Sequence, residues 1–112
     1  MKHAVLITLA AMIAAALCPN VHGQSATAQI TGTITDSSGA AMTQVKITVS
    51  STQTGLTRET RTGDSGNYAF PLLPVGVYAL TAEQAGFKVQ KRTDIRLNVD
   101  QVARLDLTMD VG

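Results

Sequence analysis

Cysteine and histidine are scarce in this chain of 112 residues, and neither occurs after position 22. The single cysteine is Cys18, and the two histidines are His3 and His22. The region from Gln24 onward therefore cannot form a disulfide and lacks both the commonest metal ligand and the usual acid–base residue near neutral pH. We accordingly expect no enzyme activity, no catalytic residue, no cofactor and no metal.

Aromatic residues and an excess of charge are also lacking. The chain has no Trp and only 4% aromatic residues, and its formal net charge is +1. From position 24 onward, eight Lys and Arg residues face eight Asp and Glu residues. Without a basic excess, we expect no nucleic-acid partner.

The N-terminus has the pattern of a secretory signal peptide. A short positive start, Met1–His3, precedes 14 residues, Ala4–Leu17, that are apolar apart from Thr8. That length suits a signal peptide and is shorter than the roughly 18 residues of a permanent membrane helix. Small residues at Val21 and Gly23 predict cleavage between Gly23 and Gln24. We expect a signal-peptide helix over residues 1–23, a short linker over 24–28, and an exported mature domain that is not itself transmembrane.

Two alternatives concern this leader. Ala26-Thr27-Ala28 offers a second acceptable cleavage site, although it leaves a long stretch after the apolar run. Lipidation of Cys18 is disfavoured because Leu17 stands where lipoprotein signals have a small residue.

Apolar residues alternate with polar ones through most of the remaining chain. A period of two places one face of each strand on a core and the other in water. Glycine, Asp, Asn and Ser separate the runs at short intervals, which is typical of turns. The pattern predicts one all-β domain over residues 29–110, a small antiparallel Greek-key sandwich of about seven strands. The alternating runs are Gln29–Thr35, Val45–Ser50, Asn67–Phe70, Tyr78–Ala82 and Arg104–Met109.

One stretch is polar on both faces. Thr57–Thr62 contains Arg58, Glu59 and Arg61. Charges of this kind discourage pairing between the edges of two sheets. We therefore expect this stretch to be an edge strand.

Two prolines predict a break in the sheet. Pro71 and Pro74 have no backbone N–H to donate to a neighbouring strand. We expect the chain to leave the sheet between Phe70 and Val77. Leu72 and Leu73 should then tuck under this loop and close one end of the core.

Five motifs in order carry a family resemblance: ITGTITDSSG at 30–39, VKITV at 45–49, TGDSGNYAF at 62–70, LPVGVY at 73–78 and AGF at 85–87. This order resembles the carboxypeptidase regulatory-like domain, a transthyretin-like (prealbumin-like) β-sandwich, over roughly Ala28 to Met109. The family usually approaches its second strand through a Pro-Gly-Ala-type stretch. Here that stretch is Met42–Val45, where we expect a looser loop.

The resemblance implies a role in the cell envelope. Such domains follow the signal peptide of TonB-dependent, Oar-like outer-membrane receptors, and they also stand beside zinc carboxypeptidases. We expect the N-terminal periplasmic extension of such a receptor, or a truncated fragment of one, in the periplasm or at the outer membrane. Its partner would be an envelope protein or the downstream barrel of its own parent chain. The alternatives are the accessory domain of a zinc carboxypeptidase, or a free-standing, secreted carbohydrate-binding module with a carbohydrate-binding-like fold and a glycan as partner.

Four cations form the one basic cluster in the sequence: Lys88, Lys91, Arg92 and Arg96. They are a candidate interaction surface for a membrane or an acidic partner. The competing interpretation is a solvated strand face near a turn.

Two further groups are better explained by structure than by binding. Tyr68, Tyr78 and Phe87 would suit a sugar-stacking platform, but the core-facing spacing of the two tyrosines favours packing. The loop Asp64–Asn67 is rich in oxygen atoms but lacks the six or more ligands that Ca²⁺ requires, so we expect a plain turn.

Overall fold

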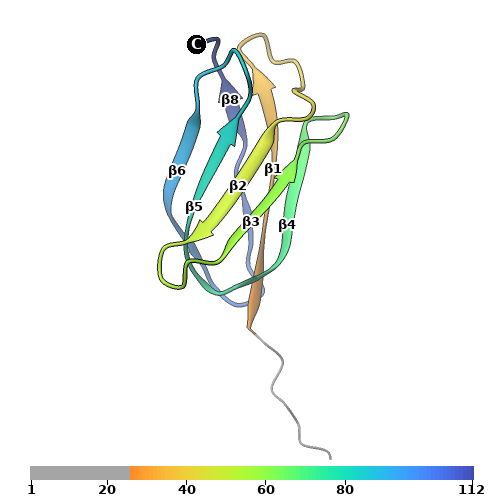
Figure 1. Ribbon diagram of the computed structural model, residues 1–112. Helices are drawn as coiled ribbons and strands as arrows, with labels where there is room; N and C mark the ends of the chain where they lie inside the picture. The colour runs from red at the N-terminus through yellow and green to blue at the C-terminus, as the bar shows by residue number, and fades with distance from the viewer. Residues whose placement is uncertain (1–25) are drawn as a thin grey trace, which may run out of the picture.

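Eight strands and no helix form residues 26–112, the part of the chain that the computed structural model describes (Figure 1). The expected signal peptide and its cleavage between Gly23 and Gln24 lie outside these residues. No helix in the described part is long and apolar enough to cross a bilayer. The strands are β1 (Thr27–Asp36), β2 (Lys46–Ser51), β3 (Thr57–Arg61), β4 (Asn67–Pro74), β5 (Gly76–Glu83), β6 (Gln90–Leu97), β7 (Val102–Arg104) and β8 (Leu107–Met109).

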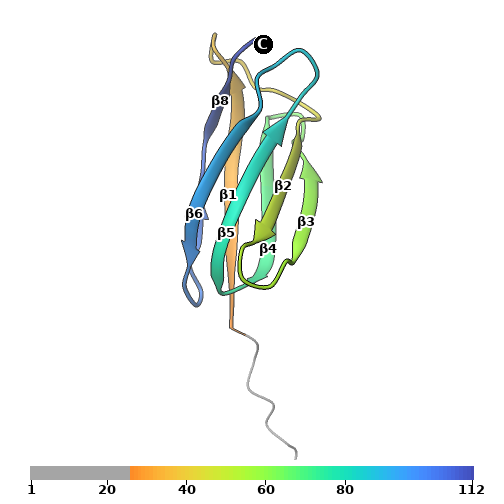
Figure 2. The same cartoon turned by 60° about the vertical axis from the view of Figure 1, so that its left-hand side comes forward.

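The strands form two sheets that face each other, as Figure 2 shows. One sheet has the order β3-β2-β5-β6, and the other has the order β4-β1-β7 with β8 also paired to β1. The all-β sandwich is thus confirmed. It is not wholly antiparallel, because β7 and β8 both run parallel to β1.

The core forms between the two sheets from the residues that the alternation assigns to it. β1 alternates between half-buried and buried positions as far as Thr35, and β2 does so along its whole length. Each fully buried Ile, Leu or Val contributes about 1.5–3 kcal/mol by leaving water, so these inward rows stabilise the sandwich. The largest fully buried side chains are Tyr78, Ile30, Ile34, Ile47, Leu73, Leu80, Met109, Val45, Val49 and Thr62.

The C-terminal run, expected as one strand over Arg104–Met109, is broken at Leu105 and Asp106. At the break the Asp106 carboxylate accepts hydrogen bonds from the backbone N–H and the hydroxyl of Thr33, at 2.9 and 3.0 Å. A side chain thus takes the place of a backbone carbonyl beside β1. The run becomes two short strands for this reason.

The Leu105 carbonyl lies against β1 where Gly32 has no side chain. A Cβ on Gly32 would overlap this carbonyl oxygen and approach the ring of Tyr68. The Tyr68 hydroxyl donates a 2.6 Å hydrogen bond to the same oxygen. Glycine at this position therefore permits close contact between β1 and the segment that joins β7 to β8.

The expectation that the prolines end the strand is wrong. β4 continues through Pro71 to Pro74. It is the outer strand of its sheet and pairs only with β1. Proline is tolerated on such an edge, because an N–H at an outward-facing position would have no neighbouring strand to bond.

The two leucines between the prolines point in opposite directions. The β1–β4 register shifts between Ala28 and Ile30, which forms a bulge. Leu72 adopts a positive φ of 55° in this segment and is 69% exposed, whereas Leu73 is 0% exposed. Only Leu73 closes the core as expected, because the bulge turns its neighbour outward.

β3 is an edge strand, as expected, and pairs only with β2. Thr62 follows it and is fully buried. Its hydroxyl donates to the Met42 carbonyl at 2.6 Å and accepts from the Val45 N–H at 2.9 Å. The Met42–Val45 loop, expected to be loose, is therefore tied to the core.

The start of β1 and the last residue lie at opposite ends of the sandwich (Figure 1). β1 starts at the end that carries the β4–β5 and β6–β7 connections. At the other end, the Gly112 N–H donates to the Gly86 carbonyl at 3.0 Å. The Lys88 N–H donates to the Asp110 carbonyl at 2.7 Å, so the last residues are attached to the β5–β6 loop.

Candidate interaction surface

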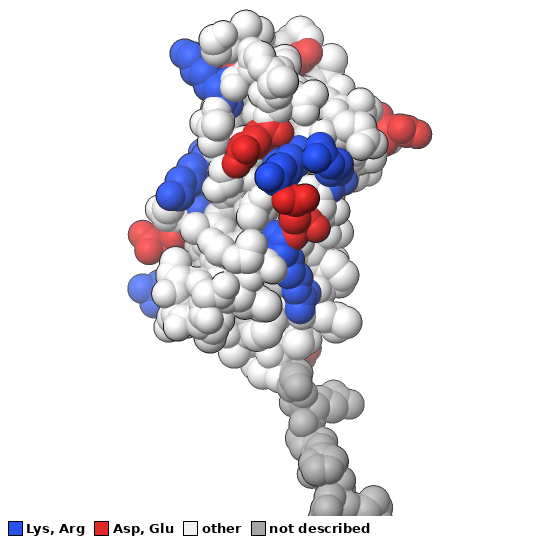
Figure 3. Space-filling view, viewed as in Figure 1, with Lys and Arg blue, Asp and Glu red and all other residues white. Residues whose placement is uncertain are grey.

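The four predicted cations lie on one edge strand or in the loop just before it. Lys91, Arg92 and Arg96 lie on β6, and Lys88 lies in the loop just before it. All four are exposed, and none forms a salt bridge within residues 26–112. Blue side chains follow the left margin of Figure 3, on the side where Figure 1 draws β6.

The cations do not share one face of the sheet. Lys91 lies opposite Thr81, and Arg96 lies opposite Val77, on the outer face. Arg92 lies opposite Leu80, whose side chain is in the core, so it projects from the other side of the edge. Cations flank the free edge of β6 on both sides. This is a feature of the edge itself and not of a flat basic face.

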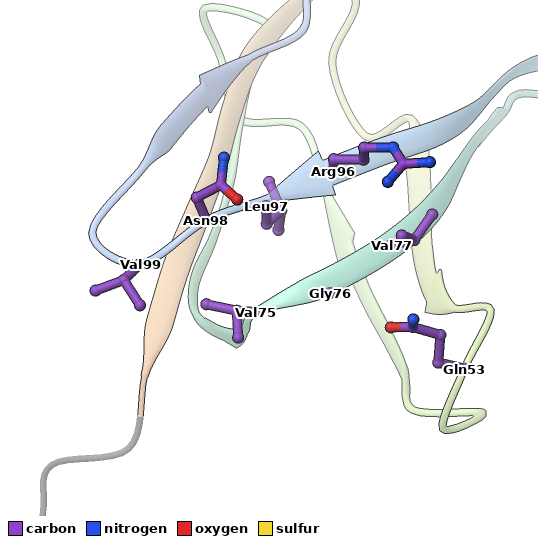
Figure 4. A pocket seen from close by; sticks show the side chains of 8 residues that line it. All are labelled: Gln53, Val75, Gly76, Val77, Arg96, Leu97, Asn98 and Val99. Atoms are coloured by element: carbon purple, nitrogen blue, oxygen red, sulfur yellow. The ribbon is translucent and has the colours of Figure 1, made fainter.

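β6 ends at an open hollow of about 460 Å³ (Figure 4). Three connections and strand ends that are distant in the sequence form its wall. Aliphatic side chains and uncharged amides predominate, and Arg96 is the one charged lining residue within the described part of the chain. The lining residues are Gln53, Val75, Gly76, Val77, Arg96, Leu97, Asn98 and Val99.

Gly76 leaves the floor of the hollow bare. Its φ of 149° lies in a region that side chains disfavour, and a Cβ there would lie 3.0 Å from the Gln53 Oε1. In Figure 4, Val75 and Val99 lie on one side of Gly76, and Gln53 and Arg96 lie on the other. The hollow can therefore hold an aliphatic group while its rim offers amides and a guanidinium for hydrogen bonding.

The tyrosines are core residues, as expected. Tyr68 and Tyr78 are buried, and each hydroxyl donates a 2.6 Å bond, to the Leu105 carbonyl and the Pro74 carbonyl respectively. Burial raises the pKa of Tyr68 to about 12, and the nearby Asp106 carboxylate adds to the effect. Phe87 packs against the core and is half-buried. These three rings therefore do not form an exposed platform on which a sugar could stack.

The oxygen-rich loop forms a turn, as expected. Asp64 and Ser65 occupy the turn, and the Gly66 N–H donates to the Gly63 carbonyl at 2.9 Å. Within residues 26–112, no three His, Cys, Asp or Glu side chains are grouped so that they could hold a metal ion.

Sequence reasoning missed the hollow and the role of Asp106. The turn signal at Val75-Gly76 was visible, but nothing local indicates that Gln53 and Val99 lie beside it. Asp106 stands in the alternating run Arg104–Met109, at a position that alternation assigns to the solvent-facing side. In the structure the Thr33 N–H donates a hydrogen bond to the Asp106 carboxylate, which is the main reason that its pKa is lowered. The Arg104 side chain also bonds this carboxylate and lowers the pKa further.

The sandwich is similar to parts of several larger solved structures. The TIE protein of Bacillus anthracis matches with a TM-score of 0.63 and 20% identity, over 77% of this chain and 17% of that one. A putative carbohydrate-binding protein from Bacteroides uniformis matches with a TM-score of 0.60 and 18% identity, over 75% of this chain and 41% of that one. The 3-chlorocatechol 1,2-dioxygenase of Rhodococcus opacus matches with a TM-score of 0.62 and 10% identity, over 80% of this chain and 62% of that one. At these identities the similarity concerns the fold alone, and this chain spans less than two thirds of each of the three.

The sequence itself matches one family model. A comparison with curated protein sequences finds no match. The model of the carboxypeptidase regulatory-like domain matches residues 29–110, which is most of the chain. This match agrees with the resemblance carried by the five motifs and with the two-sheet architecture. The chain belongs to the carboxypeptidase regulatory-like domain family.

Proposed function

We propose that this chain is a non-enzymatic interaction module of the cell envelope. Its parent would be a TonB-dependent, Oar-like outer-membrane receptor, of which it forms the N-terminal periplasmic extension. The observation that carries this proposal is the order of segments. A leader with the pattern of a signal peptide comes directly before a carboxypeptidase regulatory-like domain that fills residues 29–110.

The composition supports a binding role. The region after the leader has no cysteine or histidine. Its exposed features are an edge strand flanked by cations and a hollow with aliphatic walls. Both features can contact another polypeptide, either an envelope protein or the downstream barrel of the same chain.

Two linked measurements test the receptor assignment. The first is the coding DNA beyond the codon for Gly112, where a receptor requires a long continuing frame of amphipathic strands. The second is an immunoblot of fractionated cells with an antibody against residues 26–112. We expect a large polypeptide in the outer-membrane fraction. A small polypeptide confined to the periplasm or the medium would overturn the assignment, and a continuing zinc hydrolase domain would replace it with the carboxypeptidase accessory role.

A secreted carbohydrate-binding module is the second candidate. The fold similarity to the putative carbohydrate-binding protein from Bacteroides uniformis favours it. Because Tyr68 and Tyr78 are buried, we place the glycan in the hollow, where the amides of Gln53 and Asn98 can bond its hydroxyl groups. Calorimetric titration with soluble polysaccharides tests this, and heat that is lost in a Gln53→Ala/Asn98→Ala variant would support it.

A further inference from the structure

The four outer edges of the two sheets are not equally accessible. β3 and β4 contact each other, and the Arg58 Nη1 donates a 2.8 Å bond across to the Pro71 carbonyl. β7 and β8 are three residues each and are separated by Leu105 and Asp106. β6 is eight residues long and pairs only with β5. Within residues 26–112, no backbone hydrogen bond joins the outer edge of β6 to another segment.

The charges on β6 distinguish between the strands that could pair with its free edge. Lys91, Arg92 and Arg96 stand within six positions, and Asp94 is the one acidic residue among them. A second copy of β6 would bring like charges together, which disfavours pairing of the edge with itself. An acidic strand would meet the opposite charge. The same cations thus repel one partner and attract the other.

A bulge limits the length over which a partner can pair. The β5–β6 register shifts between Tyr78 and Leu80, and Asp94 adopts a positive φ of 56°. Bulges bend and twist an edge, so a long flat partner cannot follow all of it. Two short segments remain regular, Gln90–Arg92 and Ile95–Leu97.

The second of these segments continues directly into the hollow. Arg96 and Leu97 line it, and the chain then passes through Asn98 and Val99 on its wall. A segment that pairs beside Ile95–Leu97 therefore arrives next to an aliphatic wall with a guanidinium at its rim (Figure 4). The basic edge and the hollow are thus contiguous parts of one surface, joined at Arg96.

We propose that an acidic polypeptide segment in extended conformation adds to the free edge of β6 beside Ile95–Leu97. It places carboxylates near Arg96 and Arg92 and an aliphatic side chain in the hollow between Val75 and Val99. Backbone hydrogen bonds supply affinity in such strand addition, and side-chain pockets supply specificity. The inference rests on the proposed function as an interaction module and names the chemistry of its partner.

A capped octapeptide that alternates glutamate and valine is a suitable probe of the purified protein. We expect binding that weakens with salt and slower amide exchange at Ile95–Leu97, read by NMR. Arg96→Glu should weaken binding about tenfold because it replaces attraction by repulsion. The matched control is Arg61→Glu, which makes the same charge change on the opposite edge of the same sheet and should change affinity less than about twofold. Val99→Ser should weaken binding about threefold through lost apolar contact.

A second peptide separates strand addition from charge attraction alone. In it, alternate backbone amides are N-methylated while the side chains are unchanged. Equal binding of the two peptides would overturn strand addition. Equal loss in Arg96→Glu and Arg61→Glu would overturn the assignment to β6. Binding to phosphatidylglycerol vesicles through Arg96, with no binding to the peptide, would assign the cations of β6 to contact with a membrane surface. This outcome would also overturn the proposal.

These outcomes are distinct from those of the cellular test. A large outer-membrane polypeptide whose module ignores the acidic peptide would leave the proposed function standing and remove this inference. Peptide binding by a small free-standing protein would remove the receptor assignment and leave this inference standing.

Discussion

Two buried hydroxyl groups bond backbone atoms that the strand ladders leave free. The Tyr68 hydroxyl bonds the Leu105 carbonyl, and the Thr62 hydroxyl joins the Met42 carbonyl to the Val45 N–H. Buried backbone groups without partners are costly, so these side chains stabilise loops that would otherwise be unfavourable. At the scale of single residues, the sandwich depends on polar atoms as well as on its apolar rows.

Replacement of Thr62 tests this dependence. Thr62→Val keeps the shape but leaves the Val45 N–H and the Met42 carbonyl unpaired in the core. We expect the free energy of unfolding to fall by about 2–3 kcal/mol, measured by urea denaturation. Thr62→Ser retains the hydroxyl and serves as the control. A Val variant as stable as the wild type would show that water or loop movement satisfies both groups.

The ionisation of Tyr68 predicts a loss of stability at high pH. The folded state holds its pKa at about 12, above the ordinary value of 10. A raised pKa means that the folded state binds the proton more tightly, so the stabilisation is complete below pH 10 and is lost as pH rises towards 12.

Tyr68→Phe removes the titration of this hydroxyl. The fall in free energy of unfolding between about pH 9 and about pH 11.5 should therefore be smaller in the variant than in the wild type. Urea midpoints at the two pH values measure it. Identical falls in the two proteins would contradict a perturbed Tyr68.

At the scale of elements, edge position decides what a strand tolerates. β4 accommodates two prolines because it pairs with another strand on one side only. Its bulge presents Leu72 to solvent with a strained backbone and buries Leu73. Two adjacent residues of the same type therefore have opposite effects on stability.

Substitution of the two leucines should change stability in opposite directions. Leu72→Gly relieves a positive φ at an exposed site, and we expect the free energy of unfolding to rise by about 0.5–1 kcal/mol. Leu73→Ala should lower it by about 2–5 kcal/mol because it leaves a cavity in the core. Chemical denaturation of both variants checks the pair. Destabilisation of similar size in each would mean that both leucines pack as the sequence first indicated.

At the scale of the whole molecule, the C-terminal strands complete the sheet around β1. β1 pairs with β4 along one edge and with β7 and β8 along the other. Leu107 and Met109 of β8 are both buried in the core. The fold therefore closes through contacts between its first and last strands.

Removal of β8 should prevent cooperative folding. A chain that ends at Leu105 loses two buried side chains, each worth about 2–5 kcal/mol, against a total stability of about 5–15 kcal/mol for a typical domain. Circular dichroism should show no sharp thermal transition. The control chain ends at Met109 and loses only the attachment to Gly86 and Lys88. A sharp transition in the shorter chain would show that β8 is dispensable.

Local pattern was sufficient to predict the fold class. Alternation along β1, β2 and β5 identified the inward residues, because side chains of a strand point alternately to its two faces. The polar Thr57–Thr62 stretch likewise indicated an edge. The prolines misled because the rule against them depends on whether a strand has one neighbour or two, which no local pattern records.

The candidate surface was predicted only as a set of charges. The sequence by itself determined that Lys88, Lys91, Arg92 and Arg96 cluster, that an all-β sandwich forms, and which family the motifs resemble. Only the tertiary structure decided that these cations flank a free edge, that a hollow adjoins Arg96, and that β7 and β8 run parallel to β1. The physical reason is that strand pairing joins residues far apart in the chain, as Ile34 and Leu107 are, whereas alternation is a property of neighbours.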